Sequence, residues 1–147
     1  MKQNCPLLLV EDSRDDVELI MSALEHLRNR IDVAHDGEQA LDYLHRRGKF
    51  AGRRGGYPSL VLLDLKLPKV SGLEVLAEIR ENEELKHIPV VILTSSREDQ
   101  DLIHGYGQGA NAYVVKPVKF ADFIDAVKEI GLFWAVLNEV PRSGSAA

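Results

Sequence analysis

The sequence has 147 residues, a formal net charge of −5, and 45% hydrophobic and 28% charged residues. This length suits one ordinary domain, and the acidic balance argues against a whole-surface affinity for nucleic acid or anionic membrane. One cysteine, Cys5, excludes an internal disulfide. No apolar run approaches the roughly 20 residues that span a bilayer, and the N-terminus is too short and polar for a signal peptide, so a soluble cytoplasmic protein is expected.

The first half of the chain alternates apolar runs with helical patterns. A four-residue apolar run at 7–10 predicts a strand buried on both faces. A helix is predicted next, with Ser13 and Asp16 as its capping pair. Its apolar face consists of Val17, Ile20, Met21, Leu24 and Leu27. A shorter run at 31–34 predicts a second strand, and the apolar residues of 40–44 predict a second helix.

The second half continues this alternation. Apolar runs at 60–63, 90–93 and 112–115 predict three more strands. Apolar residues at helical spacing predict helices at 73–79, 102–106 and 120–130. Five strand–helix units predict a parallel sheet with helices on both faces, and they are too few for an eight-fold barrel. In such an open doubly wound sheet, the site is expected at the carboxyl ends of the strands.

Polar side chains follow four of the predicted strands. They are Glu11 and Asp12 after the first, Asp64 after the third, Thr94 after the fourth and Lys116 after the fifth. Each has a simpler explanation, since acidic residues cap helices and an aspartate often forms a turn. Their convergence at one sheet edge favours a site. Three crowded carboxylates repel each other unless one is protonated or a cation lies among them, and hard oxygen ligands suit Mg²⁺.

This combination of residues indicates phosphoryl chemistry. An aspartate can act as a nucleophile toward a phosphoryl group and form an acyl phosphate. Mg²⁺ and a lysine supply the positioning and charge stabilisation that phosphoryl transfer needs. A nearby hydroxyl can then hydrogen-bond the new phosphoryl oxygens.

The chain resembles the receiver domains of bacterial response regulators from about Leu7 to Ile130. The motifs that carry the resemblance are Leu8-Leu9-Val10-Glu11-Asp12, Leu62-Leu63-Asp64-Leu65-Lys66-Leu67-Pro68, Ser71-Gly72, Val91-Ile92-Leu93-Thr94-Ser95, Gly109-Ala110 and Lys116-Pro117. The resemblance implies a flavodoxin-like three-layer (βα)5 sandwich with strand order 2-1-3-4-5.

The resemblance also implies a role for each site residue. Asp64 accepts a phosphoryl group from a sensor histidine kinase, and Lys116 contacts its oxygens. Thr94 is the switch hydroxyl and Tyr113 the switch aromatic. Glu11, Asp12, Asp64 and the backbone carbonyl of Lys66 bind Mg²⁺, and the Lys116–Pro117 peptide bond is cis.

Features outside these motifs suggest a subfamily. The chain ends soon after the fifth predicted helix, a basic glycine-rich loop occupies 46–58, and the tail 132–137 is apolar. Together they resemble the single-domain response regulators associated with bacterial phytochromes. We expect a receiver domain over 1–131 and an extension over 132–147, apolar first and disordered at its end. The basic loop favours a solvated segment over a nucleic-acid patch.

The apolar tail leaves two alternatives open. It can extend the fifth helix and pack on its own sheet, or it can form a dimer interface through Phe133, Trp134 and Leu137. The second alternative predicts a homodimer that also uses the face formed by the fourth helix, fifth strand and fifth helix.

Two other functions compete with the phosphorylation switch. A phosphatase with an aspartyl nucleophile, of the haloacid-dehalogenase-like kind, needs a second acid two residues later, where this chain has Lys66. A degenerate receiver acting only as a binding scaffold is disfavoured by the complete set of site residues. We therefore expect a phosphoacceptor signalling protein that binds neither nucleic acid nor membrane, rather than an enzyme.

Overall fold

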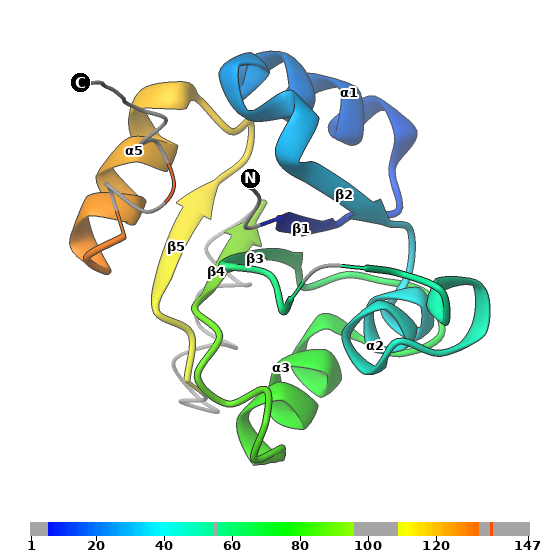
Figure 1. The fold of residues 1–147 in the computed structure, drawn as a ribbon. Coiled ribbons are helices and arrows are strands. Elements are labelled where there is room, and N and C mark those ends of the chain that lie inside the picture. Colours follow the sequence, from blue (N-terminus) through cyan, green and yellow to red (C-terminus); the bar gives the residue numbers. More distant parts are fainter. Residues whose placement is uncertain (1–5, 55, 96–108, 133–135, 137–147) are drawn as a thin grey trace, which may run out of the picture.

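The computed structural model describes residues 6–54, 56–95, 109–132 and 136. In this part, five parallel strands form one sheet in the order β2-β1-β3-β4-β5 (Figure 1). The strands are β1 (Leu7–Val10), β2 (Ile31–Ala34), β3 (Leu60–Asp64), β4 (Val90–Thr94) and β5 (Ala112–Val115). The helices are α1 (Arg14–Ala23), α2 (Gly37–His45), α3 (Gly72–Glu81) and α5 (Phe120–Glu129). This confirms the predicted flavodoxin-like fold.

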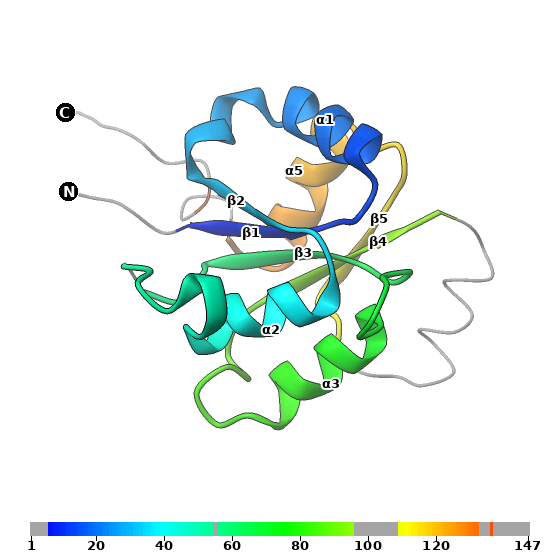
Figure 2. The same cartoon turned by 90° about the vertical axis from the view of Figure 1, so that its right-hand side faces the viewer.

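The sheet separates two hydrophobic cores. Helices α1 and α5 cover one face and α2 and α3 cover the other (Figure 2). Because successive strand residues point to opposite faces, Leu7 and Leu9 of β1 belong to the first core and Leu8 and Val10 to the second. Every residue of β1, β3 and β4 is buried, as the uninterrupted apolar runs predicted.

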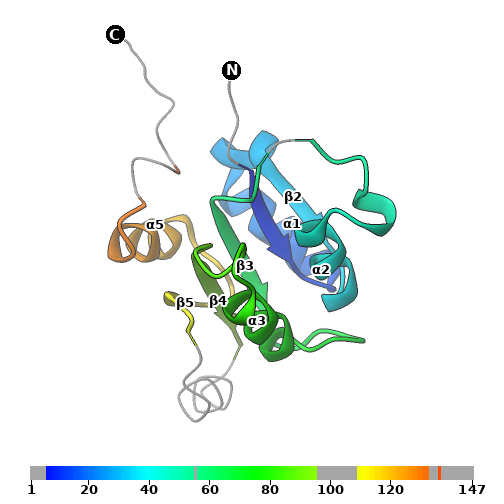
Figure 3. The same ribbon diagram turned by 60° about the horizontal axis from the view of Figure 1, so that its bottom comes forward.

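The edge strands have a different pattern. Figure 3 shows β2 and β5 at the two edges of the sheet. In β5, Ala112 and Val114 are buried, whereas Tyr113 and Val115 are exposed. Because successive strand residues point to opposite faces, this alternation shows that one face of β5 packs on the core and the other is only partly covered.

The first helix is shorter than predicted. It ends at Ala23, and a 3-10 helix, η1 (Glu25–Arg30), continues to the start of β2. Leu27 is nevertheless buried, and its N–H donates to the carbonyl of Leu24 at 2.8 Å. The tighter winding keeps Leu27 in the core, so apolar spacing alone did not reveal the change of helix type.

Arg53 fixes part of the basic loop after α2. The guanidinium of Arg53 lies 3.9 Å from the ring centre of Tyr43 and donates to the carbonyls of Tyr43 and Gly56. The Tyr43 hydroxyl donates to Asp32 of β2 at 2.6 Å. Part of the loop predicted to be solvated is therefore fixed by a cation–π contact and hydrogen bonds.

Another arginine joins α3 to the start of β5. Arg80 donates to the carbonyls of Lys86, Ile88 and Gly109 and to the side chain of Asn111, at 2.7–3.0 Å. The same Asn111 oxygen accepts from the N–H of Val90. These bonds fix both segments that lead into β4 and β5.

Part of the C-terminal tail packs on its own domain. Val136 is fully buried in the core beneath α1 and α5, and its carbonyl accepts from Arg30 at 2.6 Å. The packing that the first alternative predicts therefore holds at this residue, although α5 ends at Glu129 and is not extended through Gly131. The helix expected at 102–106 and the proposed dimer residues Phe133, Trp134 and Leu137 lie outside the described residues. Among the helices that the structure describes, none has the length and apolar character needed to cross a bilayer.

Candidate functional site

The polar residues predicted from the strand ends lie at one edge of the sheet. Glu11 and Asp12 follow β1, Asp64 and Thr94 end β3 and β4, and Lys116 follows β5. Parallel strands place all their carboxyl ends at the same edge, and the registers of β1, β3, β4 and β5 align these positions.

Three carboxylates form the centre of this site. One oxygen each of Glu11, Asp12 and Asp64 lies within 4.8 Å of the others. Glu11 and Asp64 are buried, whereas Asp12 is exposed. Burial raises the pKa of Glu11 from 4.5 to about 7; the hydrogen bond with Lys116 opposes this rise and the adjacent Asp64 adds to it. Such crowding of hard oxygen atoms, open to solvent on one side, suits a divalent cation.

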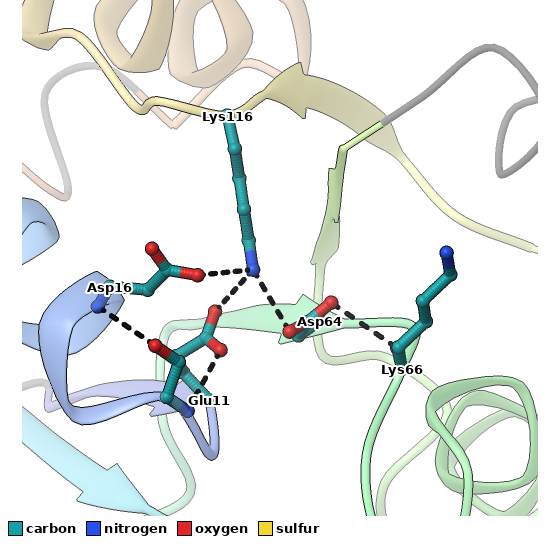
Figure 4. Close-up of polar contacts among 6 residues, drawn as sticks. Glu11, Asp16, Asp64, Lys66 and Lys116 are labelled. Atoms are coloured by element: carbon teal, nitrogen blue, oxygen red, sulfur yellow. Dashed lines mark hydrogen bonds and ion pairs between the residues drawn. The ribbon is translucent and has the colours of Figure 1, made fainter.

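Lys116 neutralises part of this charge. Its Nζ lies 2.7 Å from Glu11 Oε1, 2.9 Å from Asp64 Oδ2 and 3.1 Å from Asp16 Oδ2 (Figure 4). Burial disfavours the ammonium, but the hydrogen bonds with Glu11 and Asp64 outweigh burial and raise the pKa of Lys116. The peptide bond from Lys116 to Pro117 is cis, the conformation that the resemblance implies.

The Asp64 carboxylate is held from two sides. Its Oδ1 accepts from the backbone N–H of Lys66 at 3.2 Å, while Oδ2 faces Lys116 (Figure 4). Helix α3 starts directly beside this residue, with Ser71 as N-cap and Glu74 completing a capping box. A Cβ at Gly72 would lie 2.3 Å from the Asp64 carbonyl oxygen. Only glycine allows α3 to begin so close to Asp64.

Thr94 carries a buried hydroxyl without a hydrogen-bond partner among the residues described. The residue has no exposed surface, and its Oγ1 makes no hydrogen bond in that part of the chain. The Thr94 carbonyl, in contrast, accepts from the N–H of Lys116 at 2.7 Å. A buried hydroxyl without a partner is costly, and Thr94 Oγ1 keeps its capacity to donate or accept a hydrogen bond.

Comparison with known proteins settles the family. The sequence matches the response regulator receiver domain family over residues 7–128. The chain belongs to this family. It is 46% identical over 137 residues to the probable methanogenesis regulatory protein FilR2 of Methanothrix harundinacea, covering 92% of this chain and 86% of that one.

Two solved structures of response regulators resemble this receiver domain, and one of them is described as a bacteriophytochrome response regulator. The structure of the bacteriophytochrome response regulator AtBRR has 55% sequence identity and a TM-score of 0.87, covering 94% of this chain and all of that one. The Mn²⁺-bound form of response regulator Rcp1 has 37% identity and a TM-score of 0.70, covering 95% of this chain and all of that one. The chain is therefore a receiver domain related to phytochrome response regulators.

Sequence reasoning missed the part that Asp16 plays at this receiver site. The sequence predicts Asp16 only as part of the cap of α1, and its N–H does donate to Ser13 Oγ at 3.2 Å. Its carboxylate, however, turns to Lys116, and Glu11 Oε2 accepts from the Ser13 N–H instead. Asp16 and Lys116 are 100 positions apart in the chain, and no sequence signal predicts their contact.

Tyr113, the expected switch aromatic, lies near but not within the cluster. It is 39% exposed on β5, and its partner in the sheet is Ile92, two residues before Thr94. The expected ligand role of the Lys66 carbonyl and the switch role of Tyr113 remain predictions.

Proposed function

We propose that this chain is a phosphorylation switch in which a sensor histidine kinase transfers a phosphoryl group to Asp64. The observation that carries the proposal is the contact of Asp64 with the ammonium of Lys116, together with its place in one cluster with the carboxylates of Glu11 and Asp12. The relatives described as bacteriophytochrome response regulators support a phytochrome kinase as the phosphoryl donor. The receiver covers residues 1–131, and 132–147 form an extension.

The transfer forms one bond and breaks one. An Asp64 carboxylate oxygen attacks the phosphorus of a phosphohistidine, the P–N bond breaks, and the imidazole nitrogen keeps the electron pair and takes up a proton. Lys116 binds a phosphoryl oxygen and offsets its charge. The buried hydroxyl of Thr94, which has no partner among the described residues, donates to another phosphoryl oxygen.

Mg²⁺ fits the carboxylate cluster, with Glu11, Asp12, Asp64 and the Lys66 carbonyl as its proposed protein ligands. When bound, the ion balances the negative charge that gathers on the transferring group. Later hydrolysis restores the carboxylate: a water attacks phosphorus, the acyl phosphate P–O bond breaks, and phosphate leaves with the proton released to solvent. The chain turns over only its own phosphoryl group and is not an enzyme for external substrates.

The test is incubation with Mg²⁺ and a labelled phosphoryl-histidine kinase or acetyl phosphate. Stable labelling that disappears in Asp64→Asn supports the switch, because asparagine is isosteric but cannot form the acyl phosphate. Rapid multiple turnover of acetyl phosphate would contradict it in favour of a hydrolase. Absence of label with every donor would contradict it in favour of a scaffold.

The output of the switch is a change in protein–protein contacts. We propose that the acyl phosphate shifts the equilibrium of the surface around Thr94 and Tyr113. The exposed apolar side chains of Tyr113, Val115 and Phe120, at 39%, 50% and 40% exposure, support a homodimer that uses β5 and α5. Light scattering at micromolar concentration tests this assembly, with and without the residues after Ile130. A monomer in both forms would refute the dimer.

A further inference from the structure

Lys116 has three carboxylate partners in the described part of the chain, and one of them lies outside the carboxylate cluster. Glu11, Asp12 and Asp64 can offer ligand atoms to one metal ion, whereas Asp16 does not belong to that group within the described chain. Asp16 nevertheless lies 3.1 Å from Lys116 Nζ. Figure 4 shows Asp16 and Asp64 on opposite sides of the ammonium, with Glu11 between them.

The three partners differ in exposure. The side chain of Glu11 is 1% exposed and that of Asp64 is 10% exposed, whereas that of Asp16 is 35% exposed. Lys116 therefore contacts both the two buried carboxylates of Glu11 and Asp64 and the more solvent-exposed carboxylate of Asp16. Its two buried partners are the carboxylates that we propose as metal ligands.

The ammonium and a metal ion would draw on the same two carboxylates. A cation among Glu11, Asp12 and Asp64 would repel Lys116 and bind carboxylates that Lys116 now contacts through one oxygen each. Lys116 has to give up part of these contacts and still remain close enough to receive a phosphoryl oxygen. A carboxylate that is not a metal ligand can hold it there.

We propose that Asp16 is a positioning residue that holds Lys116 beside the site while Glu11 and Asp64 turn to Mg²⁺. This inference rests on the metal site of the proposed function. Asp16 is well placed because α1 fixes it: its N–H bonds to Ser13 Oγ, and the Ser13 N–H bonds to Glu11 Oε2. The first turn of α1 therefore ties the position of Asp16 to that of Glu11.

A simpler role for Asp16 is to stabilise α1, because an acidic residue in the first turn favours the helix dipole. Asp15 serves as a matched control for this role. It carries the same charge in the same first turn and is exposed, and the partners of Lys116 are Glu11, Asp16 and Asp64. Asparagine at either position removes one charge and preserves the size of the side chain.

The experiment measures Mg²⁺ affinity by isothermal titration calorimetry, without any phosphoryl donor, in the wild type, Asp16→Asn and Asp15→Asn. Without Asp16, Lys116 stays on Glu11 and Asp64, so Asp16→Asn should weaken Mg²⁺ binding by about threefold to tenfold, and Asp15→Asn by less than about twofold. Urea unfolding of each protein checks that the fold is retained.

A double-mutant cycle separates positioning from direct attraction between Asp16 and the ion. In a Lys116→Met background, the additional loss caused by Asp16→Asn should shrink to that of Asp15→Asn. Equal losses in Asp16→Asn and Asp15→Asn, or an undiminished loss in the Lys116→Met background, would overturn the inference while leaving the proposed metal site intact. A wild type that binds no Mg²⁺ would refute the metal site, and with it this inference.

Discussion

The buried hydroxyl of Thr94 gives a prediction with an unusual sign. Thr94→Val replaces the hydroxyl by a methyl group of similar size in a residue with no exposed surface. Burying a hydroxyl without a partner costs about 1–3 kcal/mol, and that cost disappears in the variant. We therefore expect the unphosphorylated variant to be more stable than the wild type by about 1–2 kcal/mol.

Urea unfolding measures this difference as a higher transition midpoint with an unchanged slope. In thermal unfolding, the same gain corresponds to an increase in Tm of roughly 3–8 °C. Ser71→Ala supplies the opposite case, because Ser71 Oγ accepts from the Glu74 N–H and caps α3. Its loss should destabilise the protein by about 1 kcal/mol.

Phosphorylation should remove the advantage of the Thr94 variant. With acetyl phosphate and Mg²⁺ present, the wild-type hydroxyl gains a phosphoryl acceptor that valine cannot use. The stability difference should then shrink or change sign. A Thr94→Val protein that is less stable than the wild type without phosphorylation, at an unchanged slope, would show that the hydroxyl already has a partner and would refute the reasoning.

Three further predictions concern other parts of the structure. Folding raises the pKa of Glu11 from 4.5 to about 7, so the metal-free wild type should lose up to about 3 kcal/mol of stability relative to Glu11→Gln as pH rises from 4.5 to 7. If urea unfolding gives the same stability difference between the two proteins at pH 5 and at pH 8, this prediction is wrong. Arg80→Lys should destabilise the protein by about 2–3 kcal/mol, since a lysine cannot reproduce the bonds to three carbonyls and Asn111; chemical denaturation that leaves this variant unchanged would refute the clamp. Gly72→Ala should cost more than about 2 kcal/mol and slow phosphorylation of Asp64, because its Cβ meets the Asp64 carbonyl; normal labelling and stability would show that α3 can shift freely.

The buried framework could be predicted from the sequence because its signals are local. The apolar runs of β1, β3 and β4 predicted these strands, and the cap residue Ser13 correctly marked the start of α1. The parallel arrangement then placed Asp64 beside Glu11, because it brings strand ends together whatever their separation in sequence.

The missing parts depend on contacts between distant residues. Asp16 looked like a cap because its actual partner, Lys116, lies on another element. Arg80 ends an ordinary helical pattern, and its four acceptors come from residues 86–111. Leu27 fitted the helical spacing even though the backbone there is a 3-10 helix. The positions of these side chains depend on contacts with residues far away in the sequence. The spacing of apolar residues along the chain carries no information about such contacts.

The hydrogen bond from Arg30 to the Val136 carbonyl also indicates where a fusion partner can be attached to this protein. Arg30 directly precedes β2, whose first residue pairs with Leu7, so Val136 and the start of β1 lie at the same edge of the sheet. Asp64 and Lys116 lie at the opposite edge, where the strands end. A fluorescent reporter fused before Leu7 or after Val136 would therefore begin its linker away from the phosphoacceptor and leave that edge open to a kinase.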